Sequence, residues 1–352
     1  MDEQVNTEIA PAELGAPQDP SLIRRIFRNR FDQWRAGWRM VLYLLAVGLV
    51  GFGLVLLMRL IPDAGDAPFI SWRRSVPWVV GSLALVLGAF VVLRFFDRRP
   101  IGMLGLDLSR GWLQELLVGL AAGLVATGTL VLILLLFGSV SLELSPSATA
   151  SLAVLPLLFF IFLWAGALEE LVFRGYLMQA MAEGSRRWIA AVLLCIPFTW
   201  GHADNPDVTG IGVANIFLAG VTLAVLYFQT RRLWLPISFH LSWNLTQSWL
   251  WGFDVSGIKI DHQFFLMTPT GSDLVTGGEF GLEGSVLSTI FFILLIGWLL
   301  VLKPLKPTAE VAAMWAAYPG GWGMAPEGFP EEVEQGSEGE EKQESEEFGI
   351  RN

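Results

Sequence analysis

Long apolar stretches without charged residues constrain this chain more than any other feature of its sequence. A bilayer core about 30 Å thick requires roughly 20 apolar residues per helix. Hydrophobic residues make up 53% of the 352 positions, and only 16% are charged, against about 25% in a soluble domain. We therefore expect an all-α fold, a polytopic transmembrane bundle of about eight spans. The predicted spans are 38–58, 76–96, 113–137, 152–178, 187–205, 211–229, 232–251 and 285–302.

Basic residues are distributed unevenly among the connections between these spans. Arginines and lysines gather before the first span and after the second, fourth, sixth and eighth, whereas residues 138–151 and 203–210 contain none. Cytoplasmic connections carry the excess of positive charge in membrane proteins. The pattern therefore predicts that both termini are cytoplasmic, with Arg59, Arg73 and Arg74 as the discordant group.

Charge and composition divide the chain into three predicted parts. Residues 1–36 form a cytoplasmic arm, 37–302 the transmembrane bundle, and 303–352 a cytoplasmic tail rich in glutamate, which we expect to be disordered. Much of the net charge of −10 comes from that tail. Residues 252–284 are expected to form a long external loop. Nothing resembles a basic stripe with interleaved aromatics, so no nucleic-acid partner is expected. The single cysteine, Cys195, excludes a disulfide within the chain.

Ionisable residues inside membrane spans are costly and usually functional. The fourth predicted span ends with two adjacent carboxylates, Glu169 and Glu170, followed by Arg174. Glu170 and Arg174 are spaced i,i+4 and share one helix face. Adjacent helical residues point about 100° apart, so this pairing leaves Glu169 available for chemistry. The alternative is that all three form one ion-pair cluster at the membrane interface.

Two further spans carry polar groups that suit hydrolysis. The fifth predicted span contains Phe198 and His202, and the seventh contains His240 and Asn244 at i,i+4 spacing. Taken singly, these side chains are typical of a packed core histidine and of a polar contact between helices. Taken with the carboxylates, they form a hydrolytic set: a base for water, imidazoles to share its proton, and donors to an oxyanion.

These residues resemble the motifs of the CAAX-prenyl protease and bacteriocin-processing family of intramembrane proteases, also called the Abi or CPBP family. Its motifs are two adjacent glutamates with an arginine five positions after the first, a phenylalanine four residues before a histidine, and a histidine four residues before an asparagine. The resemblance covers about residues 101–250. The matching residues are Glu169, Glu170, Arg174, Phe198, His202, His240 and Asn244.

The resemblance implies peptide-bond hydrolysis inside a membrane, which we expect to be the cytoplasmic membrane of a prokaryote. By position, Glu169 would be the general base and His202 would assist it. His240 and Asn244 would stabilise the oxyanion. Glu170 and Arg174 would hold the geometry, and Phe198 would support it.

Depth within the membrane sets a condition on this assignment. His202 lies near the far end of its predicted span, so that span must be short, tilted or broken near Pro197 to bring the imidazole level with Glu169. We expect the two side chains to lie within about 8 Å of each other, which leaves room for a bridging solvent molecule.

Alternatives to a metal-free glutamic protease remain at this point. Glu169, His202 and His240 could instead bind zinc with one open position, although the sequence lacks the His-Glu-x-x-His signature. No cofactor is favoured. A non-catalytic bacteriocin-immunity or peptide-binding membrane protein is the second class, and a transporter is the third. The expected partners are the lipid bilayer and a membrane-associated peptide or protein whose identity stays open: a prenylated tail, a bacteriocin leader or another membrane-protein tail.

Overall fold

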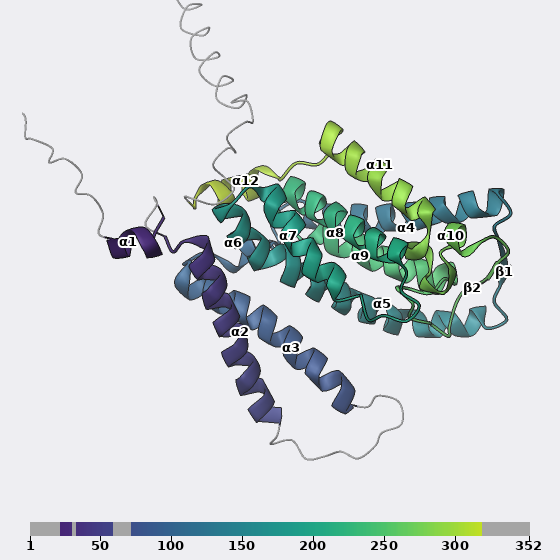
Figure 1. The fold of residues 1–352 in the computed structure, drawn as a ribbon, viewed down its shortest axis with the longest axis horizontal. Helices are drawn as coiled ribbons and strands as arrows, with labels where there is room; N and C mark the ends of the chain where they lie inside the picture. The colour runs from purple at the N-terminus through teal and green to yellow at the C-terminus, as the bar shows by residue number, and fades with distance from the viewer. Residues whose placement is uncertain (1–21, 30–32, 59–71, 319–352) are drawn as a thin grey trace, which may run out of the picture.

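The computed structural model describes residues 22–29, 33–58 and 72–318, and most of these are helical (Figure 1). The α-helices are α1 (Leu22–Phe27), α2 (Ala36–Met58), α3 (Trp72–Val91), α4 (Trp112–Leu136), α5 (Ala148–Glu170), α6 (Leu177–Gly184), α7 (Arg187–Trp200), α8 (Gly210–Thr230), α9 (Trp234–Leu245), α10 (Asp273–Thr276), α11 (Val286–Leu302) and α12 (Ala309–Ala316). Three π-helical segments are η1 (Val92–Phe96), η3 (Leu171–Tyr176) and η4 (Thr246–Leu250). Three 3-10 segments are η2 (Ile101–Leu104), η5 (Gly278–Phe280) and η6 (Leu282–Gly284), and the strands are β1 (Val140–Leu144) and β2 (Phe265–Pro269).

Each predicted span coincides with a helical segment of the structure. Within the described residues, four helical stretches are long and apolar enough to cross a membrane, and these are Ala36–Leu57, Trp112–Leu136, Ala148–Gly184 and Gly210–Thr230. Three shorter apolar helical stretches are Val80–Phe96, Arg187–Trp200 and Val286–Leu302. The helical content of the fold is therefore confirmed, whereas the number of eight crossings and the orientation of the termini stay predictions.

The bundle is built around α9. Helices α4, α5 and α8 all pack against it, while α8 also contacts α7 and α11. Figure 1 shows these helices running along the long axis of the molecule, with α2 and α3 as a pair that leaves the bundle at an angle. The central position of α9 places His240 and Asn244 where several helices meet.

Small residues let α4 and α9 approach closely. Gly119 and Gly123 of α4 face Ser238 and Ser242 of α9, and a Cβ built at Gly119 would lie 1.9 Å from the hydroxyl of Ser238. Ser242 Oγ also donates to the carbonyl of Leu120 at 2.6 Å. Pairs of small residues four apart are a common basis for helix association in membranes. His240 lies two residues from each serine, and residues two apart on a helix point in nearly opposite directions. Burying the serine face against α4 therefore turns His240 away from α4.

A two-stranded sheet departs from the expected all-α fold. Strand β1 pairs antiparallel with β2, and Val140 lies opposite Pro269. The partners come from the connections 138–151 and 252–284, which are both poor in basic residues. Each strand is too short for an alternation of apolar and polar residues to reveal it in the sequence. Figure 1 shows the pair at the end of the bundle opposite α12.

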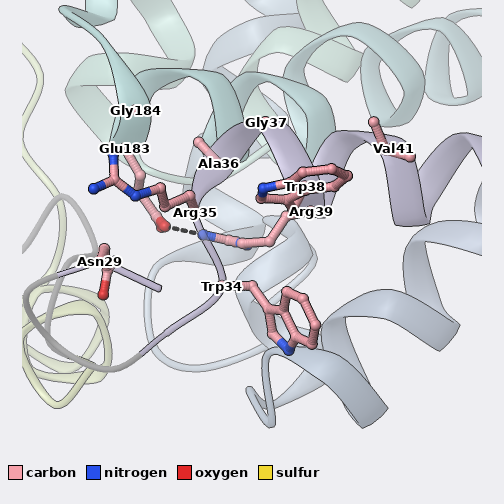
Figure 2. Close-up of a pocket in the computed structure, with 10 residues that line it drawn as sticks. All are labelled: Asn29, Trp34, Arg35, Ala36, Gly37, Trp38, Arg39, Val41, Glu183 and Gly184. Atoms are coloured by element: carbon pink, nitrogen blue, oxygen red, sulfur yellow. Dashed lines mark hydrogen bonds and ion pairs between the residues drawn. The ribbon is translucent and has the colours of Figure 1, made fainter. Parts of the chain in front are cut away.

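Several arginines counted as cytoplasmic charge belong to buried ion pairs. Arg39, which is 2% exposed, contacts Glu183 and lies 2.7 Å from Asp97, and Arg99 also pairs with Glu183. A pocket of about 650 Å³ lies at the start of α2, lined by Arg39, Glu183, Trp34 and seven further residues. Figure 2 shows Arg39 and Glu183 beside it. None of its lining residues belongs to the candidate site described below. Arg39 thus holds α2 against the end of α6, and Arg99 joins the segment after η1 to the same glutamate.

The predicted arm and tail are described in part. Residues 1–21 and 319–352 lie outside the described residues, so predictions about them have no structural outcome. The first part of the expected disordered tail differs from that expectation because it contains α12. Val311 and Trp315 of this helix are fully buried in a cluster with Tyr43 and Met103. Burial of these apolar side chains stabilises the short helix. The sequence did not indicate it, because the residues that follow are rich in glutamate.

Candidate active site

The end of α5 departs from regular helix where it carries the paired carboxylates. Glu169 and Glu170 close α5, and the chain continues as the π-helical segment η3 with Arg174 inside it. Gly175 has φ −73° and ψ −121°, which is outside helical geometry. Segments of π-helix are rare and are frequent at functional sites. The two glutamates also differ in environment: Glu170 is fully buried, whereas the side chain of Glu169 is 25% exposed.

Glu170 is held by a cation and by a histidine. Arg174 Nη1 donates to its Oε1 at 3.0 Å, so the ion pair expected from the i,i+4 spacing is present. Nδ1 of His240 lies 3.0 Å from the same oxygen. Arg174 also donates from Nη2 to the carbonyl of Gly220 at 3.0 Å. A buried charge requires partners of this kind, and together they join η3, α8 and α9.

His240 lies between the two carboxylates. Its Nδ1 contacts Glu170, and its Nε2 is 3.9 Å from Oε2 of Glu169. That second separation is too long for a direct hydrogen bond and is suited to a bridging water. Oε2 of Glu169 is buried and has no hydrogen-bond partner within the described residues. Gly166 of α5 borders the imidazole, because a Cβ there would lie 3.5 Å from Cγ of His240, an ordinary van der Waals contact.

His202 follows a helix that is shorter than a full span. Helix α7 has 14 residues, or about 21 Å at 1.5 Å per residue, and His202 lies in the turn after it. Of the three expected arrangements, a short, tilted or broken span, the length of α7 agrees with the first. Nδ1 of His202 lies 2.9 Å from the carbonyl oxygen of Phe198. A donor at Nδ1 leaves Nε2 as the acceptor in a neutral imidazole.

The ring of Phe198 joins the three motifs. Its centroid lies 5.2 Å from that of His202 and 6.4 Å from that of His240. The guanidinium of Arg174 lies over the same ring at 4.3 Å, a distance at which a cation and an aromatic face attract. Both imidazoles therefore border one buried phenyl ring beside the ion pair. The predicted separation of His202 from Glu169 stays a prediction.

Asn244 lies one turn beyond His240 on the same side of α9. It is half-buried, and its backbone carbonyl accepts a hydrogen bond from Ser248 at 2.8 Å. Its carboxamide makes no hydrogen bond to any other residue that the structure describes. The helix becomes π-helical in η4, two residues after it. An amide N–H in this position is available to a ligand oxygen.

The three residues considered as zinc ligands do not form a metal-binding group. Across residues 22–29, 33–58 and 72–318, no set of three or more histidine, cysteine, aspartate or glutamate side chains is arranged to hold a metal ion. Nδ1 of His240 is engaged by Glu170. Whether activity depends on a metal ion is therefore tested with a chelator.

Sequence reasoning missed two parts of this site. Gly220 of α8 has no side chain, so Arg174 can reach its backbone carbonyl. A glycine in an apolar helix gives no indication in the sequence that it belongs to a site. Glu283, in the connection before α11, is buried and lies three residues after Phe280, which clusters with Phe198. It lies far along the chain from the motifs, with no spacing that relates it to them.

Apolar helices packed around this buried polar centre define an integral membrane protein. Residues 150–246 match the family described as type II CAAX prenyl endopeptidase Rce1-like. All seven motif residues lie in the stretch that matches this CAAX protease family model. The resemblance seen in the motifs is thereby confirmed.

A curated relative agrees with this assignment. The chain is 33% identical over 78 residues to the protein named "Putative membrane peptidase YdiL" from Bacillus subtilis (strain 168), which is 22% of this chain and 30% of the relative. The chain thus matches less than a third of the length of this relative. No solved structure matches the chain.

Proposed function

We propose that this protein is an intramembrane endopeptidase that hydrolyses a peptide bond with water activated by Glu169. The observation that carries the proposal is the position of His240, whose two nitrogens face the two adjacent carboxylates while Arg174 neutralises Glu170. This leaves Glu169 as the carboxylate that no arginine or lysine contacts among the described residues. A carboxylate of this kind can accept a proton from water.

The proposed reaction needs one base and one set of donors. Glu169 takes a proton from water as the water oxygen attacks the peptide carbonyl carbon. His240 and Asn244 donate to the resulting oxyanion, whose charge is stabilised by prearranged donors. His202 helps to orient the water. The carbon–nitrogen bond then breaks, and the proton held by Glu169 passes to the leaving amine.

The proposed substrate is a membrane-associated peptide or protein, and a prenylated carboxyl-terminal tail is the first candidate because the matching family is described as CAAX prenyl endopeptidases. Bacteriocin leaders and other membrane-protein tails form the remainder of the substrate panel. The surrounding helices expose large apolar side chains, such as Phe160, Ile196 and Trp200, which suits a substrate that approaches through lipid.

Topology forms part of the same proposal. We propose eight crossings with both termini in the cytoplasm, in the cytoplasmic membrane of a prokaryote. Because the chain has one cysteine, Cys195, which is buried, single cysteines added elsewhere report their own accessibility. A cysteine placed at Lys306 should react only after the cytoplasmic side is opened, and one at Lys259 should react from outside. The reverse labelling pattern would show that the protein has the opposite orientation in the membrane.

The test of activity compares wild type with Glu169→Gln in detergent, on prenylated and leader peptides, with and without a strong zinc chelator. We expect the wild type to cleave in both conditions and Glu169→Gln to lose at least about a hundredfold in kcat. Chelator inhibition that zinc reverses would transfer the proposal to the zinc-dependent protease. Full activity of Glu169→Gln would reject this base and favour the non-catalytic, peptide-binding alternative.

A further inference from the structure

The loop formed by residues 252–284 carries a buried carboxylate into the molecule. Glu283 of η6 is 8% exposed, and its Oε2 accepts hydrogen bonds from the backbone N of Ser256 at 2.6 Å and from its Oγ at 2.7 Å. Burial raises the pKa of Glu283 above its ordinary value, which means that its ionised form costs free energy in the fold.

The charges that favour the ionised form of Glu283 come from the candidate site. No lysine or arginine in the described part of the chain forms an ion pair with it, and positive charge on His202 or His240 would lower its pKa. Ser256, which donates both hydrogen bonds to Glu283, precedes Gly257, and Gly257 packs on Pro206 shortly after His202. The carboxylate is therefore held on the part of the loop that contacts the turn carrying His202.

Two helices fix the backbone of Glu283. Asn215 of α8 is fully buried, and its Nδ2 donates to the carbonyls of Glu283 and Ser285, each at 2.8 Å. Its Oδ1 accepts from Thr289 of α11 at 2.7 Å. The side chain of Asn215 is thus used entirely in holding η6 and α11 against α8.

The same loop packs on the segment that carries His202. Phe280 is completely buried and clusters with Phe198 and Ile216, and Phe198 is the ring that borders both imidazoles. Gly257 lies so close to the turn after His202 that a Cβ there would be 1.9 Å from the carbonyl oxygen of Pro206. Loop 252–284 therefore packs directly against the segment that carries His202 and forms one side of the site.

We propose that Glu283 is a positioning residue of this site, brought to the two histidines by loop 252–284 to hold His202 in place and to stabilise positive charge on the imidazoles during peptide hydrolysis. The proposal rests on the proposed function. It adds to the site a residue that lies outside the stretch 150–246 matched by the family.

A purely structural role for Glu283 predicts a different result from substitution. Glutamine has nearly the same shape and keeps an oxygen to accept both hydrogen bonds from Ser256, while it removes a buried charge. Replacing a buried charge by a neutral group of similar volume is often neutral or stabilising. Glu283→Gln should therefore leave activity unchanged if the residue only packs, and should lower kcat if its charge acts on the histidines.

The experiment measures kcat, KM and the thermal unfolding midpoint of the full chain for wild type, Glu283→Gln and Glu283→Asp. The matched control is Glu279→Gln, in the same loop, where Glu279 and its partner Lys259 are each 64% exposed. We expect Glu283→Gln to lower kcat at least tenfold with KM within twofold and with an unchanged or raised midpoint. Glu283→Asp should recover part of kcat, and Glu279→Gln should match wild type. Wild-type kcat in Glu283→Gln, or a loss that only follows a lowered midpoint, would overturn the proposal.

A second measurement separates this proposal from the proposed function. Glu283→Gln, His202→Gln and the double variant form a cycle of unfolding midpoints. Non-additive midpoints support an interaction between the two side chains whether or not the protein cleaves a peptide, and additive midpoints reject it. Failure of the proposed function appears separately, as full activity of Glu169→Gln in the same assay.

Discussion

Nδ1 of His240 lies 3.0 Å from Oε1 of Glu170, the carboxylate oxygen that also accepts a hydrogen bond from Arg174. The ion-paired glutamate, rather than its neighbour, therefore orients this imidazole. Glu169 faces the other nitrogen of the ring at 3.9 Å. Two adjacent and chemically identical residues are thus given different tasks by their surroundings, and substitution should separate these tasks.

Glu170→Gln should damage both the fold and the activity. The change leaves Arg174, which is 1% exposed, without its carboxylate in a buried environment. Removing one member of a buried pair costs about 3–5 kcal/mol. We expect a lowered unfolding midpoint in detergent together with loss of cleavage.

Glu169→Gln is the matched control for Glu170→Gln because it makes the same change one residue earlier. It should abolish cleavage while keeping the free energy of unfolding within about 0.5 kcal/mol of wild type, the usual range for substitutions away from buried networks. Equal destabilisation by both substitutions would contradict the division of roles and would favour the single interfacial ion-pair cluster.

Gly220→Ala should impair the site through Arg174. An added Cβ would lie 3.1 Å from Sγ of Cys195, 3.2 Å from Nη2 of Arg174 and 3.2 Å from Phe198. All three neighbours are buried, so the guanidinium is the group that shifts. We expect kcat to fall about tenfold, equivalent to about 1.4 kcal/mol, as measured by steady-state cleavage.

The control for this substitution is Gly48→Ala in α2, where nothing lies within 4 Å of an added Cβ. It should keep wild-type activity and should stabilise the helix by roughly 0.5–1 kcal/mol. Wild-type kcat in Gly220→Ala would show that the bond from Arg174 to the Gly220 carbonyl has no part in the geometry of the site.

The helical segments and the ion pair of Glu170 with Arg174 were predictable from the sequence, for identifiable reasons. Apolar stretches long enough to cross a membrane can be recognised directly in the sequence. The i,i+4 spacing of Glu170 and Arg174 places both side chains on one helix face. The π-helical geometry of η3 and η4 was not predictable, because it arises from packing against other helices. Glu283 was missed because a loop brings it to the site through tertiary contacts, which leave no periodic pattern.

Gly119→Ala should separate α4 from α9. The added Cβ would lie 1.9 Å from Oγ of Ser238 and 2.6 Å from the carbonyl oxygen of Leu235, so both a side chain and the backbone of α9 must move. Overpacking typically costs about 1–3 kcal/mol. The unfolding midpoint and kcat should both fall, since α9 carries His240 and Asn244. Gly128 lies about two and a half turns further along α4, and a Cβ there would lie 3.5 Å from Trp251, an ordinary contact. Gly128→Ala should therefore change neither quantity, and equal effects at the two positions would argue against a specific α4–α9 contact.

Asp107 provides a prediction about pH outside the membrane spans. Burial acts to raise its pKa, but hydrogen bonds from Ser109 and Arg232 outweigh burial and lower the pKa below its ordinary value. The bond from Nη2 of Arg232 measures 2.7 Å. Because the pKa of the folded state lies below the unfolded value of about 3.9, the folded protein favours the ionised carboxylate, and its contribution to stability is complete above that pH.

The contribution of Asp107 should therefore disappear as the solution becomes acidic. We expect Asp107→Asn to unfold at a lower temperature than wild type by a constant margin between about pH 7 and pH 5. The margin should close as the pH falls below about 3.9 and through the pKa of the folded state. Thermal unfolding of both proteins across this range measures the margin directly. A margin that persists undiminished to about pH 2 would mean that the neutral Asp107 side chain, rather than its charge, holds Arg232 at the start of α4.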